Sequence, residues 1–128
     1  MSSGFTLEPR EAYLYVHLEP GFEITPGNVS RLWTAMSESC REHGLQKALS
    51  EGDGVTRRLT PTESFDLVGL LSKLMPGLTV ALCFRGYVPD EQSQSFRTAA
   101  MGRGVRMEFF QDLNAALQWL GARAVPKR

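Results

Sequence analysis

The residues best suited to bind a ligand lie in two segments that each follow an expected strand. The first carries Arg57, Arg58, Thr60 and Thr62, directly before and at the start of an expected helix. The free N–H groups and the dipole of a helix N-terminus favour anions, so this segment is a candidate site for a phosphate or carboxylate. The alternative is a solvated loop with a structural helix cap, which is a common arrangement.

The second segment, Arg85-Gly86-Tyr87, follows an apolar strand. In open parallel sheets, ligands usually bind beyond the carboxyl ends of the strands, and there this loop and the 51–60 loop should converge. Arg85 and Tyr87 are therefore candidate ligand-binding residues. An ordinary connecting loop is the alternative interpretation.

No pattern of residues points to covalent, acid–base or metal chemistry. His17 and His43 fall in different expected elements, with no cysteine or carboxylate at ligand spacing. We find no serine elbow, Cys–His pairing or inward-facing pair of carboxylates. Gly52-Asp53-Gly54 lacks the spacing and the Lys-Ser/Thr pair of a phosphate-binding loop, so it predicts a plain turn. We expect no catalytic residues, no cofactor and no metal.

The composition is that of one globular domain of 128 residues, with 42% hydrophobic and 22% charged residues. Fourteen basic residues balance fourteen acidic ones, so no net field draws the chain to nucleic acid or an anionic membrane. We see no apolar run long enough to cross a bilayer and no secretory signal. Cys40 and Cys83 are too few for a disulfide scaffold and are expected to be buried, reduced thiols. These features predict a cytoplasmic protein that is neither an integral membrane protein nor a nucleic-acid binder.

Strand and helix signals alternate along the chain, which predicts an α/β fold with a mostly parallel sheet of about four to five strands. The expected strands cover residues 12–19, 45–51, 78–84 and 105–109. The expected helices begin near residues 26, 61, 91 and 112 and end near residues 43, 75, 102 and 121. A single domain over residues 1–128 follows, with its core at about 12–121 and flexible ends.

The first expected strand alternates in polarity, with Tyr13, Tyr15 and His17 on one face and aliphatic residues on the other. Parallel strands that are covered on both faces should instead be continuously apolar. We infer helices mainly on one face of the sheet, with the other face partly open. Alternatively, the alternating strands are edge strands, which tolerate polar residues.

The strip formed by Tyr13, Tyr15 and His17 suits a protein interface, because each tyrosine ring is apolar with one polar tip. A symmetric homodimer is the commonest way to bury such a strip. The competing interpretation is that residues 5–8 fold back as an edge strand and leave the tyrosines half-exposed.

The helix expected after residue 60 is apolar over an unusually wide arc. A helix packed on one sheet face needs only about a third of its circumference apolar. The apolar residues are Phe65, Leu67, Val68, Leu70, Leu71, Leu74 and Met75. Neighbouring helices could bury the excess. Otherwise Phe65, Leu67 and Leu70 mark a partner surface or the wall of a lipid pocket.

The order of these segments resembles a known family. A Tyr-Leu-Tyr-Val-His-Leu strand precedes a Thr-Pro helix, a strand, an acidic Gly turn and a Thr-Pro-Thr-Glu helix. Three further segments follow: Arg103-Gly104-Val105-Arg106, Phe109-Phe110-Gln111-Asp112 and, at the end of the match, Ala115-Ala116-Leu117-Gln118-Trp119-Leu120. From Tyr13 to Leu120 the chain is similar to the SpoIIAA-like, or STAS-like, bacterial proteins. The last stretch is the most specific part of the likeness.

The resemblance implies a β-α superhelix with its helices gathered on one side of the sheet. It also implies a non-enzymatic regulatory module that binds a protein partner, or a carrier or sensor of a lipid or other apolar small molecule, as in the related CRAL-TRIO fold. STAS domains are switched by phosphorylation at a helix start that carries an Asp-Ser motif. This chain has Thr60-Pro61-Thr62-Glu63-Ser64 there instead, so Thr60, Thr62 and Ser64 are the candidate phosphorylation sites.

Overall fold

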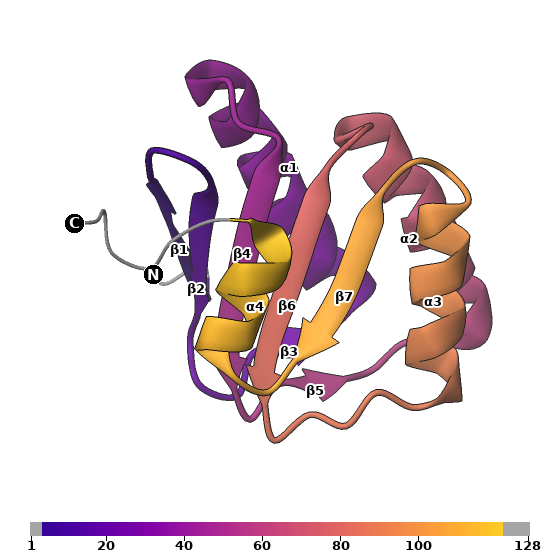
Figure 1. Cartoon of the computed structure of the whole chain (residues 1–128). Helices are drawn as coiled ribbons and strands as arrows, with labels where there is room; N and C mark the ends of the chain where they lie inside the picture. The colour runs from indigo at the N-terminus through magenta and orange to yellow at the C-terminus, as the bar shows by residue number, and fades with distance from the viewer. Residues whose placement is uncertain (1–3, 122–128) are drawn as a thin grey trace.

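The computed structural model describes residues 4–121, and its strands and helices alternate much as the sequence predicts (Figure 1). The strands are β1 (Phe5–Pro9), β2 (Leu14–Leu18), β3 (Glu23–Ile24), β4 (Lys47–Asp53), β5 (Thr56–Arg57), β6 (Thr79–Arg85) and β7 (Arg106–Phe110). The helices are α1 (Pro26–His43), α2 (Pro61–Leu74), α3 (Glu91–Met101) and α4 (Leu113–Leu120). The tail that we expected to be flexible, residues 122–128, lies outside the described residues.

Five strands form one mixed sheet in the order β1-β2-β4-β6-β7. The last four run parallel to their neighbours, whereas β1 pairs antiparallel with β2, from Phe5 opposite Leu18 to Pro9 opposite Leu14. The prediction of an α/β fold with a mostly parallel sheet is confirmed. β1 is the edge strand that the competing interpretation placed at residues 5–8, so the sheet begins at Phe5 rather than near residue 12.

Two short strands form a second sheet that the sequence did not predict. β3 and β5 pair in parallel, with Glu23 opposite Thr56 and Ile24 opposite Arg57. Figure 1 shows this small sheet beside the carboxyl ends of the long parallel strands. Strands of two residues are too short to carry a readable hydrophobic period. Their effect is to place Arg57 at that end of the main sheet.

The helices cover the two faces of the sheet unequally (Figure 1). α1 packs against β1 and β2, α3 packs against β7, and α2 lies between α1 and α3. α4 packs on the opposite face, against β4, β6 and β7. The prediction of helices mainly on one face is confirmed.

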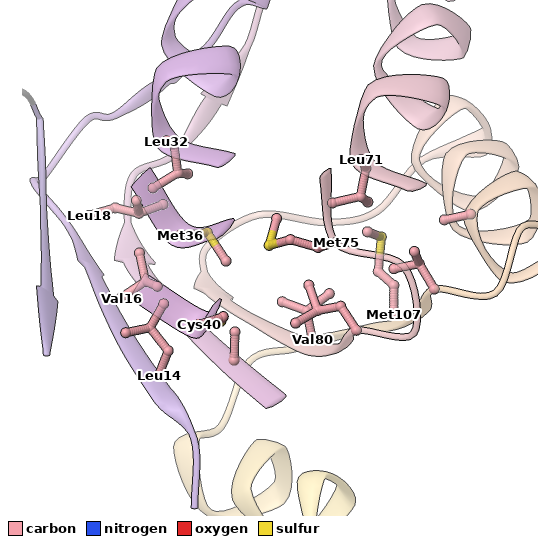
Figure 2. Packing of buried hydrophobic residues seen from close by; sticks show 14 of the residues in the cluster. Leu14, Val16, Leu18, Leu32, Met36, Cys40, Leu71, Met75, Val80 and Met107 are labelled. Carbon is pink, nitrogen blue, oxygen red and sulfur yellow. The ribbon is translucent and has the colours of Figure 1, made fainter. Parts of the chain in front are cut away.

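Side-chain alternation along the strands builds one apolar cluster under each layer of helices. The larger cluster lies under α1, α2 and α3, and Figure 2 shows Met36 and Met75 facing one another between α1 and α2. The smaller cluster lies under α4 and contains Leu49, Ala81 and Leu117.

Tyr13 is buried, which corrects the expectation that it lies on an open sheet face. Its side chain is 3% exposed and packs in the smaller cluster, because α4 covers that part of the sheet. The Tyr13 hydroxyl accepts a hydrogen bond from Arg10 Nη1 at 3.0 Å. Tyr15 is half-buried and His17 is exposed. A homodimer through this strip remains a prediction, and it would now depend on Tyr15 and His17 alone.

The start of α2 is a complete capping box, as its sequence predicts. Thr60 Oγ1 accepts a hydrogen bond from the Glu63 N–H at 3.1 Å, and Glu63 Oε1 accepts one from the Thr60 N–H at 2.9 Å. The other helices are capped by Thr25, Asp90 and Asp112. Each cap contributes about 1 kcal/mol to the stability of its helix. Because a cap bonds to backbone groups within its own first turn, the four helix starts are encoded locally.

Two expectations from composition can be compared with the structure. Cys40 and Cys83 are both free and buried, and burial raises the pKa of both thiols. Within residues 4–121, none of the helices combines the length and apolar character needed to cross a bilayer.

Gly52→Ala should destabilise the fold, because a Cβ at this position would lie 2.8 Å from Val55 Cγ2 and 3.2 Å from Leu18 Cβ. Both neighbours are buried, so accommodating the methyl group costs about 1–3 kcal/mol of unfolding free energy. Gly69→Ala in α2 is the control. Its Cβ would meet only the flexible end of Arg103, at 3.4 Å, and alanine favours a helix over glycine by about 1 kcal/mol. Urea denaturation measures both, and equal unfolding free energies would contradict the prediction.

Candidate functional site

A cavity of about 100 Å³ lies between the main sheet and helices α1, α2 and α3. It lies near the carboxyl ends of the parallel strands, since its lining includes Leu18 of β2, Phe84 of β6 and Phe109 of β7. α2 packs against α1 and α3, and in the described part of the chain its backbone does not approach any strand closely. The space under α2 is therefore filled only by the side chains that reach into it.

The lining of the cavity is mostly apolar, with polar groups gathered at one end. The apolar lining is Leu18, Phe22, Ile24, Val29, Leu32, Trp33, Met36, Leu59, Leu67, Leu71, Leu78, Val80, Leu82, Phe84, Phe96, Met107 and Phe109. The polar lining is Ser50, Arg57, Ser64, Tyr87, Gln92 and Ser93. Except for Ser50 in β4, these polar residues come from β5 and from the segments around the starts of α2 and α3.

Arg57 organises the polar end of the cavity. Its guanidinium donates to both carboxylate oxygens of Asp90, at 2.7 and 2.8 Å. Arg57 Nη1 also lies 3.3 Å from the Tyr87 hydroxyl and 3.2 Å from Ser93 Oγ, and these two hydroxyls are 2.7 Å apart. The hydrogen bonds between Arg57 and Asp90 hold the pKa of Asp90 well below its usual range and raise the pKa of Arg57. The charge of Arg57 is thus balanced within the chain.

A second polar contact joins α3 to α2. Gln92 Nε2 donates to Ser64 Oγ at 2.7 Å and to the Leu59 carbonyl at 3.1 Å. Ser64 is buried because the helical phase of α2 turns it towards α3. This corrects the expectation that Ser64 is open to phosphorylation, which requires an accessible hydroxyl. Thr60 uses its hydroxyl in the capping box, so exposed Thr62 is the candidate that remains.

The start of α2 does not form the anion site expected from Arg57, Arg58, Thr60 and Thr62. The Glu63 carboxylate already accepts the Thr60 N–H and supplies negative charge at this helix N-terminus. Arg58 Nε lies 3.3 Å from Glu23 Oε2, and Arg57 turns to Asp90. The geometry is that of the alternative interpretation, a structural cap beside a loop.

The loops after β4 and β6 converge as expected, but Arg85 and Tyr87 lie on opposite faces of the sheet. Tyr87 lines the cavity and contacts Arg57. Arg85 lies on the face of α4 and forms ion pairs with Glu51 at 2.8 Å and with Asp53 at 2.8 Å. Strand alternation alone would place residues 85 and 87 on the same face, but β6 ends at Arg85 and the chain turns at Gly86, where φ is 83°. The sequence segment that seemed to be one site is therefore divided between two.

Arg85 belongs to a polar network that ties strands β2, β4 and β6 together. The Tyr15 hydroxyl donates to Glu51 Oε1 at 2.5 Å, and Arg85 pairs with the other oxygen of the same carboxylate. Burial and the hydrogen bond to Glu51 raise the pKa of Tyr15 to about 12. The Arg10 guanidinium also lies 4.3 Å from the centre of the Tyr15 ring. These contacts satisfy the polar groups of Tyr15 within the chain.

The wide apolar arc of α2 is divided among three environments. Leu67 is 7% exposed and lines the cavity, Leu70 is half-buried, and Phe65 is 62% exposed. Leu67 is therefore a core residue and not part of a partner surface. Neighbouring helices bury most of the arc, as one of the two interpretations held.

Phe65 borders a groove of about 420 Å³ between α2 and α3. Ser64, Gln92 and Phe96 line both this groove and the cavity, so the Gln92–Ser64 hydrogen bond lies at the boundary between the two. The sequence signal for this groove was the excess apolar width of α2. The same apolar width also predicted the wall of a lipid pocket, and Leu67 of this arc lines the cavity.

Across the described range 4–121, no three His, Cys, Asp or Glu side chains gather as metal ligands would. The groups that the cavity offers to a ligand are apolar side chains and, at one end, hydroxyl, amide and guanidinium groups.

Comparison with known proteins identifies the fold. No protein-family model matches the chain, and no curated protein matches it. Among solved structures, the chain is similar to an uncharacterised protein of the DUF3478 family with a SpoIIAA-like fold, from Shewanella loihica PV-4. The two are 21% identical, the match covers 91% of each chain, and the TM-score is 0.51. At this identity the similarity shows the fold alone, which is SpoIIAA-like, as the sequence resemblance implied.

Asp90→Asn should weaken the polar end of the cavity without removing a helix cap, because asparagine caps a helix as well as aspartate does. We expect a loss of about 1 kcal/mol of unfolding free energy at pH 7, a small value because the Asp90 side chain is 54% exposed and solvent screens the pair. Urea denaturation of wild type and variant measures this difference.

The same pair of proteins tests the pH dependence. The pKa of Asp90 is lowered in the folded state, so its contribution is present above the unfolded pKa of about 4 and is lost as the pH falls below it. The difference between wild type and Asp90→Asn should therefore shrink between pH 7 and pH 3. A difference of constant size at both pH values would show that the ion pair with Arg57 is not its source.

Proposed function

We propose that this protein is a non-enzymatic binding module that holds a compact apolar molecule between its sheet and helices α1, α2 and α3. The observation that carries the proposal is the apolar cavity of about 100 Å³ inside a single domain. Protein interiors are close-packed and contain few voids larger than a water molecule. Apolar side chains that border an unfilled space lose dispersion contacts, which costs the fold stability. A bound molecule would offset that cost.

The size of the cavity narrows the class of ligand. An apolar cavity of about 150 Å³ accepts benzene, and pockets for larger ligands measure about 300–1,000 Å³. The cavity here is smaller than both, which favours a molecule no larger than benzene over a full-length lipid. Met36 and Met107 line it, and their unbranched side chains adjust readily to a guest. The proposal therefore keeps the apolar small molecule of the sequence analysis and sets the long-chain lipid aside.

A protein partner is the second candidate, and the exposed Phe65 favours it. A phenylalanine that is 62% exposed beside a groove between two helices is typical of a site for an apolar anchor from another protein. Because Ser64, Gln92 and Phe96 line both spaces, a molecule in the cavity would alter the groove through these shared side chains. The two candidates are thus compatible, with the protein acting as a sensor of the small molecule.

Native mass spectrometry of protein purified from cells tests the cavity. We expect a reproducible additional mass on the wild-type chain that is released on denaturation. Val29→Phe should abolish it, because Val29 lines the cavity and the larger ring occupies the space. Val29→Ile is the matched control, since it adds a single methylene, and should retain the mass. Thermal melting is the check that both variants are folded. A wild-type chain without any additional mass in repeated preparations would contradict the proposal.

Phe65→Asp tests the groove. The change should leave the unfolding free energy within about 0.5 kcal/mol of wild type, because Phe65 is exposed and an acidic residue is favourable near the start of a helix. It should remove a partner that is captured by wild type in a pull-down. Val88→Asp is the control, as another exposed apolar residue at 81%. Identical partners on wild type and a folded Phe65→Asp chain would count against this surface.

A further inference from the structure

Two buried serines provide hydroxyl groups to the cavity. Ser50 lies in β4, is 3% exposed and lines the cavity from the sheet. Within residues 4–121 the structure records no hydrogen bond from its side chain to another residue. Ser64 lines the cavity from α2, and its oxygen accepts a hydrogen bond from Gln92 Nε2 at 2.7 Å. A serine hydroxyl has one hydrogen to donate, so both serines keep a donor for a molecule in the cavity.

The other polar groups at this end are already engaged with one another. Arg57 donates to both oxygens of Asp90 and reaches the hydroxyls of Tyr87 and Ser93, which also bond to each other. The Asp90 carboxylate accepts the Ser93 N–H as well. Binding a ligand through this cluster would require breaking a connected set of hydrogen bonds. Ser50 and Ser64 are the groups that can bond to a ligand without such a loss.

The charges at the cavity disfavour an anionic ligand. Of the lining side chains within the described range, Arg57 alone is charged, and its bidentate pair with Asp90 balances that charge. A carboxylate ligand would either displace Asp90 or lie beside it as a like charge. Burying an unpaired carboxylate among apolar side chains is strongly unfavourable.

From this arrangement we infer that the cavity selects a neutral, compact apolar molecule that carries a hydrogen-bond acceptor, such as a ketone or an ester, and that Ser50 or Ser64 donates to that acceptor. This inference rests on the proposed function, because it names the chemistry of the molecule that the cavity holds. Ser50 and Ser64 are then residues that determine specificity, and the apolar lining contributes affinity without selecting a functional group.

Three small molecules of nearly equal size and shape, each with fewer non-hydrogen atoms than benzene, serve as probes: isopentane, butanone and propanoate. Their affinities for the full-length protein are measured by titrations that follow backbone amide chemical shifts. The variants are Ser50→Ala and Ser64→Ala. Ser72→Ala in α2 is the control, because Ser72 bonds to the Gly69 carbonyl and is not part of the cavity lining.

We expect butanone to bind more tightly than propanoate. At least one of Ser50→Ala and Ser64→Ala should weaken butanone binding by about threefold to tenfold, the usual worth of one neutral hydrogen bond. The same variant should leave isopentane binding within twofold of wild type, since that probe has no acceptor. Ser72→Ala should change neither affinity.

The inference is overturned if propanoate binds most tightly, if neither serine variant weakens butanone binding, or if a serine variant weakens butanone and isopentane binding equally. In those cases the cavity still binds a small molecule, and the proposed function stands. Binding of none of the three probes, together with a bare chain in native mass spectrometry, overturns the proposed function and this inference with it.

Discussion

The position of α2 is the constraint on which the rest of the candidate site depends. This helix is held between α1 and α3, and its backbone does not closely approach a strand within the described residues. Its side chains must therefore span the distance to the sheet. Leu71 does so from the helix side, and Val80 and Met107 approach it from the sheet side (Figure 2). Leu67 of α2 also lines the space between them. Where these side chains fall short of one another, an apolar cavity remains.

Polar contacts join the starts of α2 and α3 beside the cavity. The bidentate pair between Arg57 and Asp90 ties β5 to the start of α3, and the Gln92–Ser64 hydrogen bond ties α3 to α2. Charge-assisted, bidentate pairs are among the stronger hydrogen bonds of proteins, although solvent weakens this one. These two contacts fix the starts of α2 and α3 relative to each other and to β5.

The opposite face of the sheet is packed differently from the face that borders the cavity. There α4 covers β4, β6 and β7 closely, and the remaining area near the carboxyl ends carries Tyr15, Glu51 and Arg85 in one polar network. Each of these groups is satisfied by a neighbour on the next strand. The two faces of one sheet therefore differ in their packing, because this face is closed by α4 and a polar network whereas the other borders the apolar cavity.

The sequence by itself determined the features that depend on neighbouring residues. The expected helix starts near residues 26, 61, 91 and 112 each lie within one residue of the start in the structure. Each start is set by a cap that bonds within its own first turn: Thr25, Thr60, Asp90 and Asp112. Strand alternation likewise predicted that the aliphatic side of β2 faces the larger core. These signals lie within a few residues of the atoms they position.

Only the tertiary structure decided which of the candidate residues meet. Tyr13 is buried because α4, about a hundred residues later in the chain, packs over it. Arg57 and Arg85 looked alike in sequence, yet one pairs with Asp90 beside the cavity and the other with Glu51 and Asp53 on the far face. The cavity depends on the distance between α2 and the sheet, which is set by the packing of three helices. No local pattern of residues encodes a distance of that kind.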